Sequence, residues 1–257
     1  MRSRLVLLGA ALLLAAPARS RSAEAPGPSN PELSSLLASA DAAYAVRDQP
    51  GKLQQVEADL AAADKLAPDD YGVLWRLARL DFWRSDDPAL PDEEKSRIGK
   101  RAWELGDRAT AANPRRVEGW FFAAAGMGNY SLGIGVIHAL AQGIEGKFKD
   151  RLSEAEKIDP GFMHGAIENA WGRFYFKLPW PKYDGARSER HLRKALQMNP
   201  HNVRARVYLA ELYEKAGHPQ EARKLLETAI AEQPGNYDAP EERRSQALAR
   251  AALARMK

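Results

Sequence analysis

The sequence has 257 residues, and its 38 lysines and arginines against 34 aspartates and glutamates give a formal charge of +4. Hydrophobic residues make up 45% and charged residues 28%, which excludes wholesale disorder, a collagen repeat and a multi-span membrane protein. The sequence contains no cysteine, so a disulfide framework, a thiolate zinc site, an iron–sulfur cluster and a lipid-modified cysteine are excluded.

Residues 1–18 have the pattern of a secretory signal peptide. Two arginines precede a stretch of 12 apolar or small residues, 5–16, which at about 1.5 Å per residue is too short for a hydrocarbon core of roughly 30 Å. We expect cleavage after Ala18, with cleavage after Ser20 or an uncleaved anchor as alternatives. Residues 19–31 predict a flexible leader because they are rich in alanine, proline, glycine and serine. The predicted location is the periplasm, as a soluble protein that is not a lipoprotein.

A recurring proline predicts a helical repeat in the rest of the chain. Prolines at positions 68, 114, 160, 200 and 234 are separated by 46, 46, 40 and 34 residues. An alanine stands five residues before each of them: Ala63, Ala109, Ala155, Ala195 and Ala229. Proline ends a helix, and a small residue one turn earlier lets the next helix approach closely. Each proline is therefore expected to close one structural unit.

These units resemble the tetratricopeptide repeat (TPR), a helix–turn–helix of about 34 residues. The last unit is the most regular, and its signature residues are Leu209, Ala210, Tyr213, Ala222, Leu226, Ala229 and Pro234. The unit before it carries Trp171, Gly172, Tyr175, Leu192, Ala195 and Pro200. The units that end at Pro114 and Pro160 are each 12 residues longer than the repeat. Trp120 and Trp171 occupy the tryptophan position, where the repeat needs a bulky core residue.

The resemblance implies an all-α fold. We expect a right-handed superhelix of about five TPR-like helix pairs over residues 32–239, with lengthened central repeats. Residues 240–257 predict a C-terminal capping helix that covers the last repeat. Glu241 and Glu242 in its first turn and Arg250 and Arg255 towards its end complement a helix dipole.

Aromatic residues supply the main functional signal. Of the 21 aromatic residues, 14 fall in the windows 71–83, 120–130 and 171–183. Each window starts on the first helix of a predicted repeat, and in TPR arrays that helix lines the concave surface. The candidate ligand or partner residues are Trp75, Trp83, Phe121, Phe122, Tyr130, Phe174, Phe176, Trp180 and Tyr183. The alternative interpretation places most of these rings in the core.

Adjacent rings such as Phe121 and Phe122 cannot face the same side of a helix, because successive residues are about 100° apart. Some of these rings should therefore reach a second surface, either a ligand cavity or a neighbouring subunit. Trp180 lies in an inserted turn and is the stronger candidate for a ligand or an interface.

Residues 119–144 form a stretch of 26 residues without a charge, with glycines at 126, 128, 133, 135 and 143. The favoured interpretation is a buried pair of closely packed helices, because glycine lets backbones approach. A membrane span and a phosphate-binding loop at 126–128 are the alternatives. Polar residues interrupt the apolar run, and no strand or suitably spaced lysine accompanies the glycines.

Reactive groups show no catalytic arrangement. His164 and Glu168 are one turn apart and are compatible with a metal, but a surface hydrogen bond explains the pair more simply. Acidic runs such as Asp86 with Asp87 are typical of solvated loops and helix starts. We therefore expect no enzyme activity, no catalytic residue, no metal and no cofactor. Nucleic acid is not an expected partner either, because the sequence has no basic stripe.

Three features resemble the periplasmic T-component (TPR-like) family of tripartite TRAP-type transporters: the signal segment, the glycine-rich expansion at 126–146, and the turn at 178–181 before a regular closing repeat. The resemblance implies an exported, non-enzymatic binding protein, a homo-oligomer with a pore, that binds or passes an apolar or aromatic small ligand and docks a substrate-binding protein. The family has no short motif from which single site residues carry over to this sequence.

The alternative is a periplasmic TPR scaffold that binds a peptide or an envelope protein in its concave groove. Four cationic residues accompany the aromatic windows and leave this alternative open: Arg76, Arg79, Arg173 and Lys177.

Overall fold

Helices and their connecting loops make up the whole of the chain that the computed structural model describes, residues 30–256. The helices are α1 (Pro31–Tyr44), α2 (Lys52–Leu66), α3 (Tyr71–Ser85), α4 (Asp92–Ala112), α5 (Val117–Ile134), α6 (Val136–Ala141), α7 (Ile144–Ile158), the short 3-10 helix η1 (Phe162–His164), α8 (Ala166–Lys177), α9 (Gly185–Met198), α10 (Val203–Lys215), α11 (Pro219–Ala231) and α12 (Ala239–Arg255). The predicted signal peptide and its cleavage sites lie outside the described residues, as does nearly all of the predicted leader.

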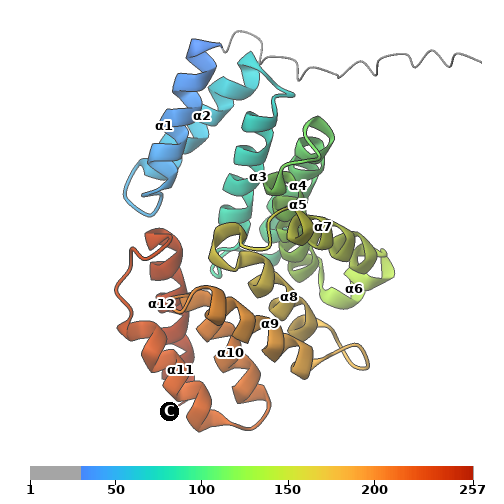
Figure 1. The fold of residues 1–257 in the computed structure, drawn as a ribbon, viewed down its shortest axis with the longest axis vertical. Helices are drawn as coiled ribbons and strands as arrows, with labels where there is room; N and C mark the ends of the chain where they lie inside the picture. Colours follow the sequence, from blue (N-terminus) through green and yellow to red (C-terminus); the bar gives the residue numbers. More distant parts are fainter. Residues whose placement is uncertain (1–29, 257) are drawn as a thin grey trace, which may run out of the picture. The chain divides into compact units, whose positions relative to one another are not determined.

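Five antiparallel helix pairs follow one another along the chain (Figure 1). The pairs are α1 with α2, α3 with α4, α5 with α7, α8 with α9, and α10 with α11. The final helix, α12, packs against both α10 and α11. The predicted all-α solenoid of five pairs with a capping helix is therefore confirmed. The central repeats are longer because α4 has 21 residues and because α6 is inserted between α5 and α7.

The predicted proline signals coincide with the ends of the second helices. Ala63, Ala109, Ala155, Ala195 and Ala229 are all 0% exposed. In the first four units, the residue before the proline donates its backbone N–H to the carbonyl of that alanine. This hydrogen bond completes the last turn, and the proline that follows, which has no N–H, cannot continue it.

Glycines bring α4 and α5 unusually close together. A Cβ atom added to Gly126 would lie 2.4 Å from the backbone nitrogen of Trp103, and one added to Gly106 would lie 2.5 Å from that of Ala123. No side chain fits at either place without moving a backbone. The predicted close packing is therefore present, but α5 packs against α4 and not against a second helix within residues 119–144.

The remainder of that uncharged stretch does not match the prediction. Gly135 separates α5 from α6, and Gly143 separates α6 from α7. Both have positive φ values, 88° and 70°. Between them α6 is largely exposed, with Ile137 at 74%. The absence of charge therefore does not indicate burial there: α6 contacts α5 and α7, but only its Ala139 is buried.

The two alternatives for this stretch are also resolved. Gly126 and Gly128 lie inside α5, so they form no phosphate-binding loop. Among residues 30–256, no helix combines the length and hydropathy that crossing a bilayer requires.

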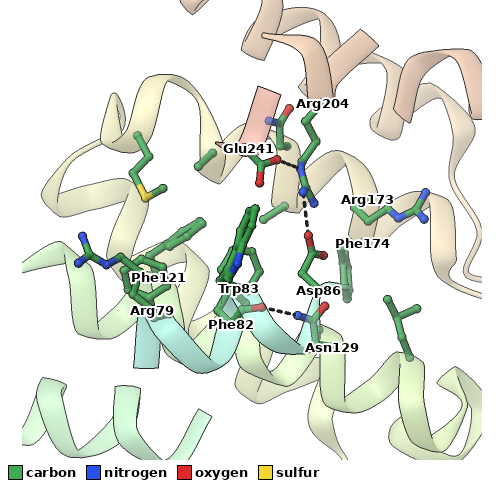
Figure 2. A pocket seen from close by; sticks show the side chains of 18 of the residues that line it. Arg79, Phe82, Trp83, Asp86, Phe121, Asn129, Arg173, Phe174, Arg204 and Glu241 are labelled. Carbon is green, nitrogen blue, oxygen red and sulfur yellow. Dashed lines mark hydrogen bonds and ion pairs between the residues drawn. The ribbon is translucent and has the colours of Figure 1, made fainter. Parts of the chain in front are cut away.

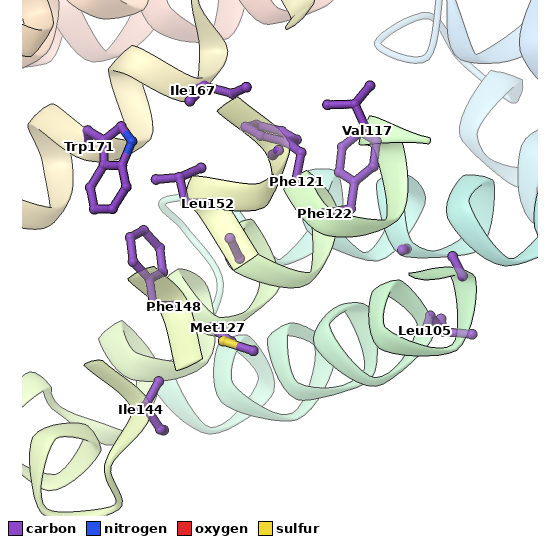
Figure 3. Close-up of a cluster of buried hydrophobic side chains, with 14 of the residues drawn as sticks. Leu105, Val117, Phe121, Phe122, Met127, Ile144, Phe148, Leu152, Ile167 and Trp171 are labelled. Atoms are coloured by element: carbon purple, nitrogen blue, oxygen red, sulfur yellow. The ribbon is translucent and has the colours of Figure 1, made fainter. Parts of the chain in front are cut away.

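The largest buried apolar cluster joins α3, α4, α5, α7 and α8 (Figure 3). Phe122 is fully buried in it, and the rings of Trp171 and Phe148 meet edge to face with centroids 6.1 Å apart. Smaller clusters hold α1 to α3 together at one end of the array and α10 to α12 at the other. The central repeats therefore form the most heavily packed part of the molecule, and their first helices line the cavity described next.

Candidate functional site

A partly open cavity of about 750 Å³ is lined mainly by the first helices of successive repeats. Its walls come from α3, α5, α8 and α10, together with η1 and the segment that leads into α12 (Figure 2). This volume lies within the range of roughly 300–1,000 Å³ that is usual for pockets that hold small molecules.

The apolar wall of the cavity is built of aromatic rings from neighbouring repeats. Phe82 on α3 lies 6.0 Å from Phe122 on α5, and Phe121 lies 5.2 Å from Phe162 on η1. Phe174 on α8 stacks on Phe148 with centroids 4.9 Å apart. These contacts anchor the rings in or against the core cluster at the border of the cavity, where Phe82, Phe162 and Phe174 remain partly exposed. The rings are thus core and cavity wall at once, so the two interpretations of the sequence are not exclusive.

Five of the nine candidate residues line this cavity: Trp75, Trp83, Phe121, Phe122 and Phe174. They come from the three aromatic windows, which the structure brings together around one space. The adjacent rings of Phe121 and Phe122 have centroids 5.2 Å apart and border the cavity, but Phe121 is 4% exposed and Phe122 is fully buried. Both rings are therefore taken up mainly by the core cluster.

The other four candidates lie elsewhere. The Tyr130 hydroxyl donates to Gln142, and its ring packs on Trp103. Phe176 and Tyr183 pack edge to face on the far side of α8 from Phe174, because two residues turn a helix by about 200°. Trp180 is 88% exposed in the loop after α8.

A polar wall faces the aromatic one, and the sequence did not predict it. Arg204 on α10 donates to Asp86, at the end of α3, over 2.7 Å and also pairs with Glu241 on α12 (Figure 2). Arg47, after α1, donates to Asp238 over 2.9 Å. The prediction that Asp86 belongs to a solvated loop is wrong, because Arg204 covers it. Arg204 and Asp86 are 118 residues apart in the sequence and Arg47 and Asp238 are 191 apart, so no local pattern connects them.

Trp83, near the end of α3, is contacted both from the loop after α1 and from α12, which lie at the two ends of the described helical array. The guanidinium carbon of Arg47 lies 3.9 Å from the centroid of its ring, and that of Arg244 on α12 lies 3.2 Å from it. Arg244 also donates to the Trp83 carbonyl over 2.7 Å, and Arg243 pairs with Asp48. We call these contacts the closing network, with the members Arg47, Asp48, Trp83, Asp86, Arg204, Asp238, Glu241, Arg243 and Arg244.

The closing network consists of charged side chains and the ring of Trp83. None of the four buried apolar clusters in residues 30–256 combines side chains of α1 to α3 with side chains of α12. The cavity is therefore closed on this side by ion pairs and cation–π contacts.

The side of α8 that faces the cavity carries a cationic group without a carboxylate partner. Asn169, Arg173 and Lys177 follow one another at four-residue spacing and all line the cavity. Arg173 pairs with Glu211 on α10, whereas Lys177 makes no ion pair in the described part of the chain. Burial lowers the pKa of the Lys177 ammonium, and the nearby positive charges of Arg173 and Lys215 lower it further, against the opposing effect of Glu211.

The reactive groups do not assemble a metal or catalytic site. Glu168 is fully buried and pairs with His191 and Lys194, so it is not joined to His164. Among residues 30–256, no group of three or more histidine, aspartate or glutamate side chains is placed to hold a metal ion. The absence of a metal, of a cofactor and of activity stays a prediction.

Comparisons with known proteins agree with this architecture. Residues 182–255, which span α9 to α12, match the family model of the tetratricopeptide repeat. The fold is similar to the crystal structure of a thermophilic TPR protein in Thermus thermophilus, with a TM-score of 0.64 and 20% sequence identity, over 86% of this chain and 99% of that one. No curated protein sequence matches the chain. These findings show the TPR solenoid fold that the resemblance implied, with a match to the repeat family over residues 182–255. TPR solenoids are generally non-catalytic scaffolds with extended concave binding surfaces.

Proposed function

We propose that this chain is an exported, non-enzymatic binding protein whose cavity holds an apolar or aromatic small ligand. The observation that carries the proposal is the cavity itself, which has about the volume of a small-molecule site and a wall of phenylalanine rings from α3, α5, α7, η1 and α8. Rings that are already anchored in the core offer a ligand apolar surface at little cost in side-chain entropy.

The closing network favours a small ligand over an extended peptide. A peptide that lies along a TPR groove needs an open concave surface over its whole length. Here the pairs Arg47–Asp238 and Arg204–Asp86 join the two ends of the array across that surface. A small molecule fits in the cavity beside these pairs, whereas a chain that lies along the whole groove would require them to separate.

We further propose that the protein acts beside a transporter, as a T-component that docks a substrate-binding protein in the periplasm. The signal-like residues 1–18 and the lengthened central repeats support this role. Trp180 and Ile137 are exposed outside the cavity and leave large apolar side chains available to a partner protein or to a second copy of this chain.

A cavity-filling substitution tests the ligand proposal. Ala170 lines the cavity, so Ala170→Trp should reduce its volume, and Ala186→Trp on the exposed side of α9 is the matched control. The neutral probe N-phenylnaphthylamine gains fluorescence in apolar sites. We expect wild type and Ala186→Trp to bind it equally, and Ala170→Trp, at unchanged helix content, to bind it at least about tenfold more weakly.

Equal probe binding by all three proteins, or binding by none, would contradict the proposal. Native mass spectrometry of protein purified from its host is a second test of the ligand proposal, because a cavity ligand should co-purify. If no small molecule co-purifies while crosslinking captures one protein partner, the scaffold alternative replaces the cavity-ligand proposal. The mass of the same sample tests export, since cleavage after Ala18 removes a defined mass.

A further inference from the structure

The lining of α8 carries an apolar and a polar stripe side by side. Ala166, Ala170 and Phe174 form the apolar stripe, and Asn169, Arg173 and Lys177 form the polar one (residues 166–177 all lie on α8). Side chains three and four residues apart stand next to one another on a helix. A ligand on this face therefore meets apolar surface and a cationic group within about two turns.

We propose that the cavity ligand is an anionic amphiphile, with an apolar body against the Phe174 side of α8 and a single anionic group, a carboxylate in the simplest case, on Lys177. This inference rests on the proposed function, because it assigns the class of ligand that the same cavity takes.

Lys177 differs from the other arginine and lysine side chains of the cavity lining in having no carboxylate or carbonyl partner within residues 30–256. The four arginines of the lining each have a carboxylate partner, in the pairs Arg47–Asp238, Arg79–Asp41, Arg173–Glu211 and Arg204–Asp86. Lys95 donates to the carbonyls of Ser85 and Asp87. Lys177 has neither kind of partner in residues 30–256, although it is partly buried. A desolvated ammonium without a counter-ion is unfavourable, and a ligand anion would supply one.

The charges around Lys177 also favour an anionic group on the ligand. Arg173 and Lys215 add two positive charges to that of Lys177, and Glu211 supplies one carboxylate. Over the rest of the lining, carboxylates outnumber cations. The Lys177 end is therefore the part of the cavity where an anion is attracted, and elsewhere it would be repelled. The Lys177 ammonium lies 5.5 Å from the centroid of the Phe176 ring, and a neutral ligand would add no counter-ion to this contact. A cationic ligand would be repelled by three neighbouring positive charges.

The test compares two ligands that differ only in charge, decanoate and decanol, by displacement of N-phenylnaphthylamine at about pH 7, where a carboxylate is ionised. We expect wild type to bind decanoate about tenfold more tightly than decanol, the size of effect that one charge-assisted hydrogen bond produces. Lys177→Met should abolish this preference, measured as the ratio of the two affinities, whereas Lys177→Arg should keep it. Lys157→Met removes an exposed lysine of α7 outside the lining and should change neither affinity.

The outcomes separate this inference from the function on which it rests. If neither decanoate nor decanol displaces the probe, and the probe itself does not bind, the proposed function fails. If both ligands bind equally well, or if Lys177→Met keeps the preference for decanoate, the cavity ligand remains and the anionic site is overturned. If N-acetyl-trileucine with a free carboxylate binds more tightly than decanoate, and its amide does not, the anion belongs to a peptide end and the amphiphile is overturned.

A pH titration gives a readout that a merely structural role for Lys177 would not change. The decanoate carboxylate stays ionised as the pH rises, while Lys177, faced by Arg173 and Lys215 as cations and by Glu211 as the carboxylate, loses its proton. Because burial lowers the pKa of Lys177 in the ligand-free protein, the preference for decanoate should begin to fall at a pH below the ordinary lysine value of about 10.4. Lys177→Arg should retain the preference over the same range, since arginine stays protonated. A preference that both proteins lose at the same pH would overturn the assignment.

Discussion

Gly126 lies where α5 crosses the backbone of α4, and its missing side chain is what allows the approach. The position of an added Cβ is 2.4 Å from the Trp103 nitrogen and 2.8 Å from the Gly99 oxygen. Gly126→Ala should therefore destabilise the protein by at least about 2 kcal/mol, because backbone has to move. Gly146 in α7 has nothing within 4 Å of the same position. Gly146→Ala should stabilise by about 0.5–1 kcal/mol through helix propensity.

Urea unfolding followed by circular dichroism measures both variants against wild type. If Gly126→Ala is as stable as wild type, the two helices are not in backbone contact. The sequence already predicted close packing from the glycines of this stretch, but only the structure shows which of them lie at the contact.

Trp171 and Trp180 belong to one aromatic window and have opposite surroundings. Trp171 is 7% exposed, its indole N–H donates to Glu156 over 3.0 Å, and its ring meets Phe148. Trp171→Ala should cost about 3–5 kcal/mol of unfolding free energy, the usual range for a buried tryptophan. Trp180→Ala should change it by no more than about 0.5 kcal/mol.

Thermal and urea unfolding of the two tryptophan variants test this contrast. A large loss of unfolding free energy for Trp180→Ala would mean that another surface covers the loop in solution.

Trp120, which the repeat pattern placed in the core, is only half-buried, and its indole N–H donates to the Pro114 carbonyl over 2.9 Å. Its truncation is therefore expected to cost less than that of Trp171.

Among the elements, α10 begins at an asparagine that joins three parts of the array. The Asn202 side-chain oxygen accepts from the Ala205 nitrogen over 2.9 Å and from the Asn169 amide over 3.2 Å. Its own amide donates to the His164 carbonyl over 3.2 Å. With 2% of its surface exposed, Asn202 cannot exchange these partners for water. The residue therefore caps α10 and ties it to α8 and η1.

Asn202→Ala should cost more than the loss of a simple helix cap. We expect at least about 2 kcal/mol, because the substitution leaves buried polar groups unpaired in addition to removing the cap. Asp184→Ala is the matched control, since Asp184 caps the exposed start of α9 through the Arg187 nitrogen and should cost about 1 kcal/mol. Equal losses in urea unfolding would show that the buried connections of Asn202 contribute nothing.

The second helices of the repeats were predictable from the sequence because their ends depend on local chemistry. In every unit the second helix ends between the alanine and the proline that follows it by five residues, so the pattern coincides with the helix end. The region around α6 was not predictable in this way. Its lack of charge resembles that of a buried helix, but burial depends on neighbours that only the whole array provides.

Across the whole molecule, the aromatic half of the cavity was predictable and the polar half was not. Rings such as Phe121 and Phe174 belong to first helices, and the stacking of the repeats places those helices around the cavity. The partners of Arg204, in contrast, come from α3 and α12. Charged residues are frequent and pair without sequence specificity, so the pairing follows from the curvature of the array and not from any pattern in the chain.

Because the closing network is polar, its strength should depend on salt and on single charges. The buried member Arg204 pairs with both Asp86 and Glu241, so Arg204→Met leaves two carboxylates facing each other. We expect the distance between α1 and α12 to increase and its distribution to broaden in this variant. The same change, to a smaller extent, is expected for wild type in about 1 M salt, where the screening length falls to about 3 Å.

The absence of native cysteine makes this distance directly measurable. Spin labels on Ser35→Cys in α1 and Ala247→Cys in α12, two exposed positions, report the distance by pulsed electron paramagnetic resonance. Arg193→Met is the control, because Arg193 pairs with Glu189 within α9 and does not connect the two ends. An unchanged distance in Arg204→Met and at high salt would mean that ion pairs do not hold the array closed. A widened distance together with faster release of N-phenylnaphthylamine would identify the closing network as the route by which the cavity is entered.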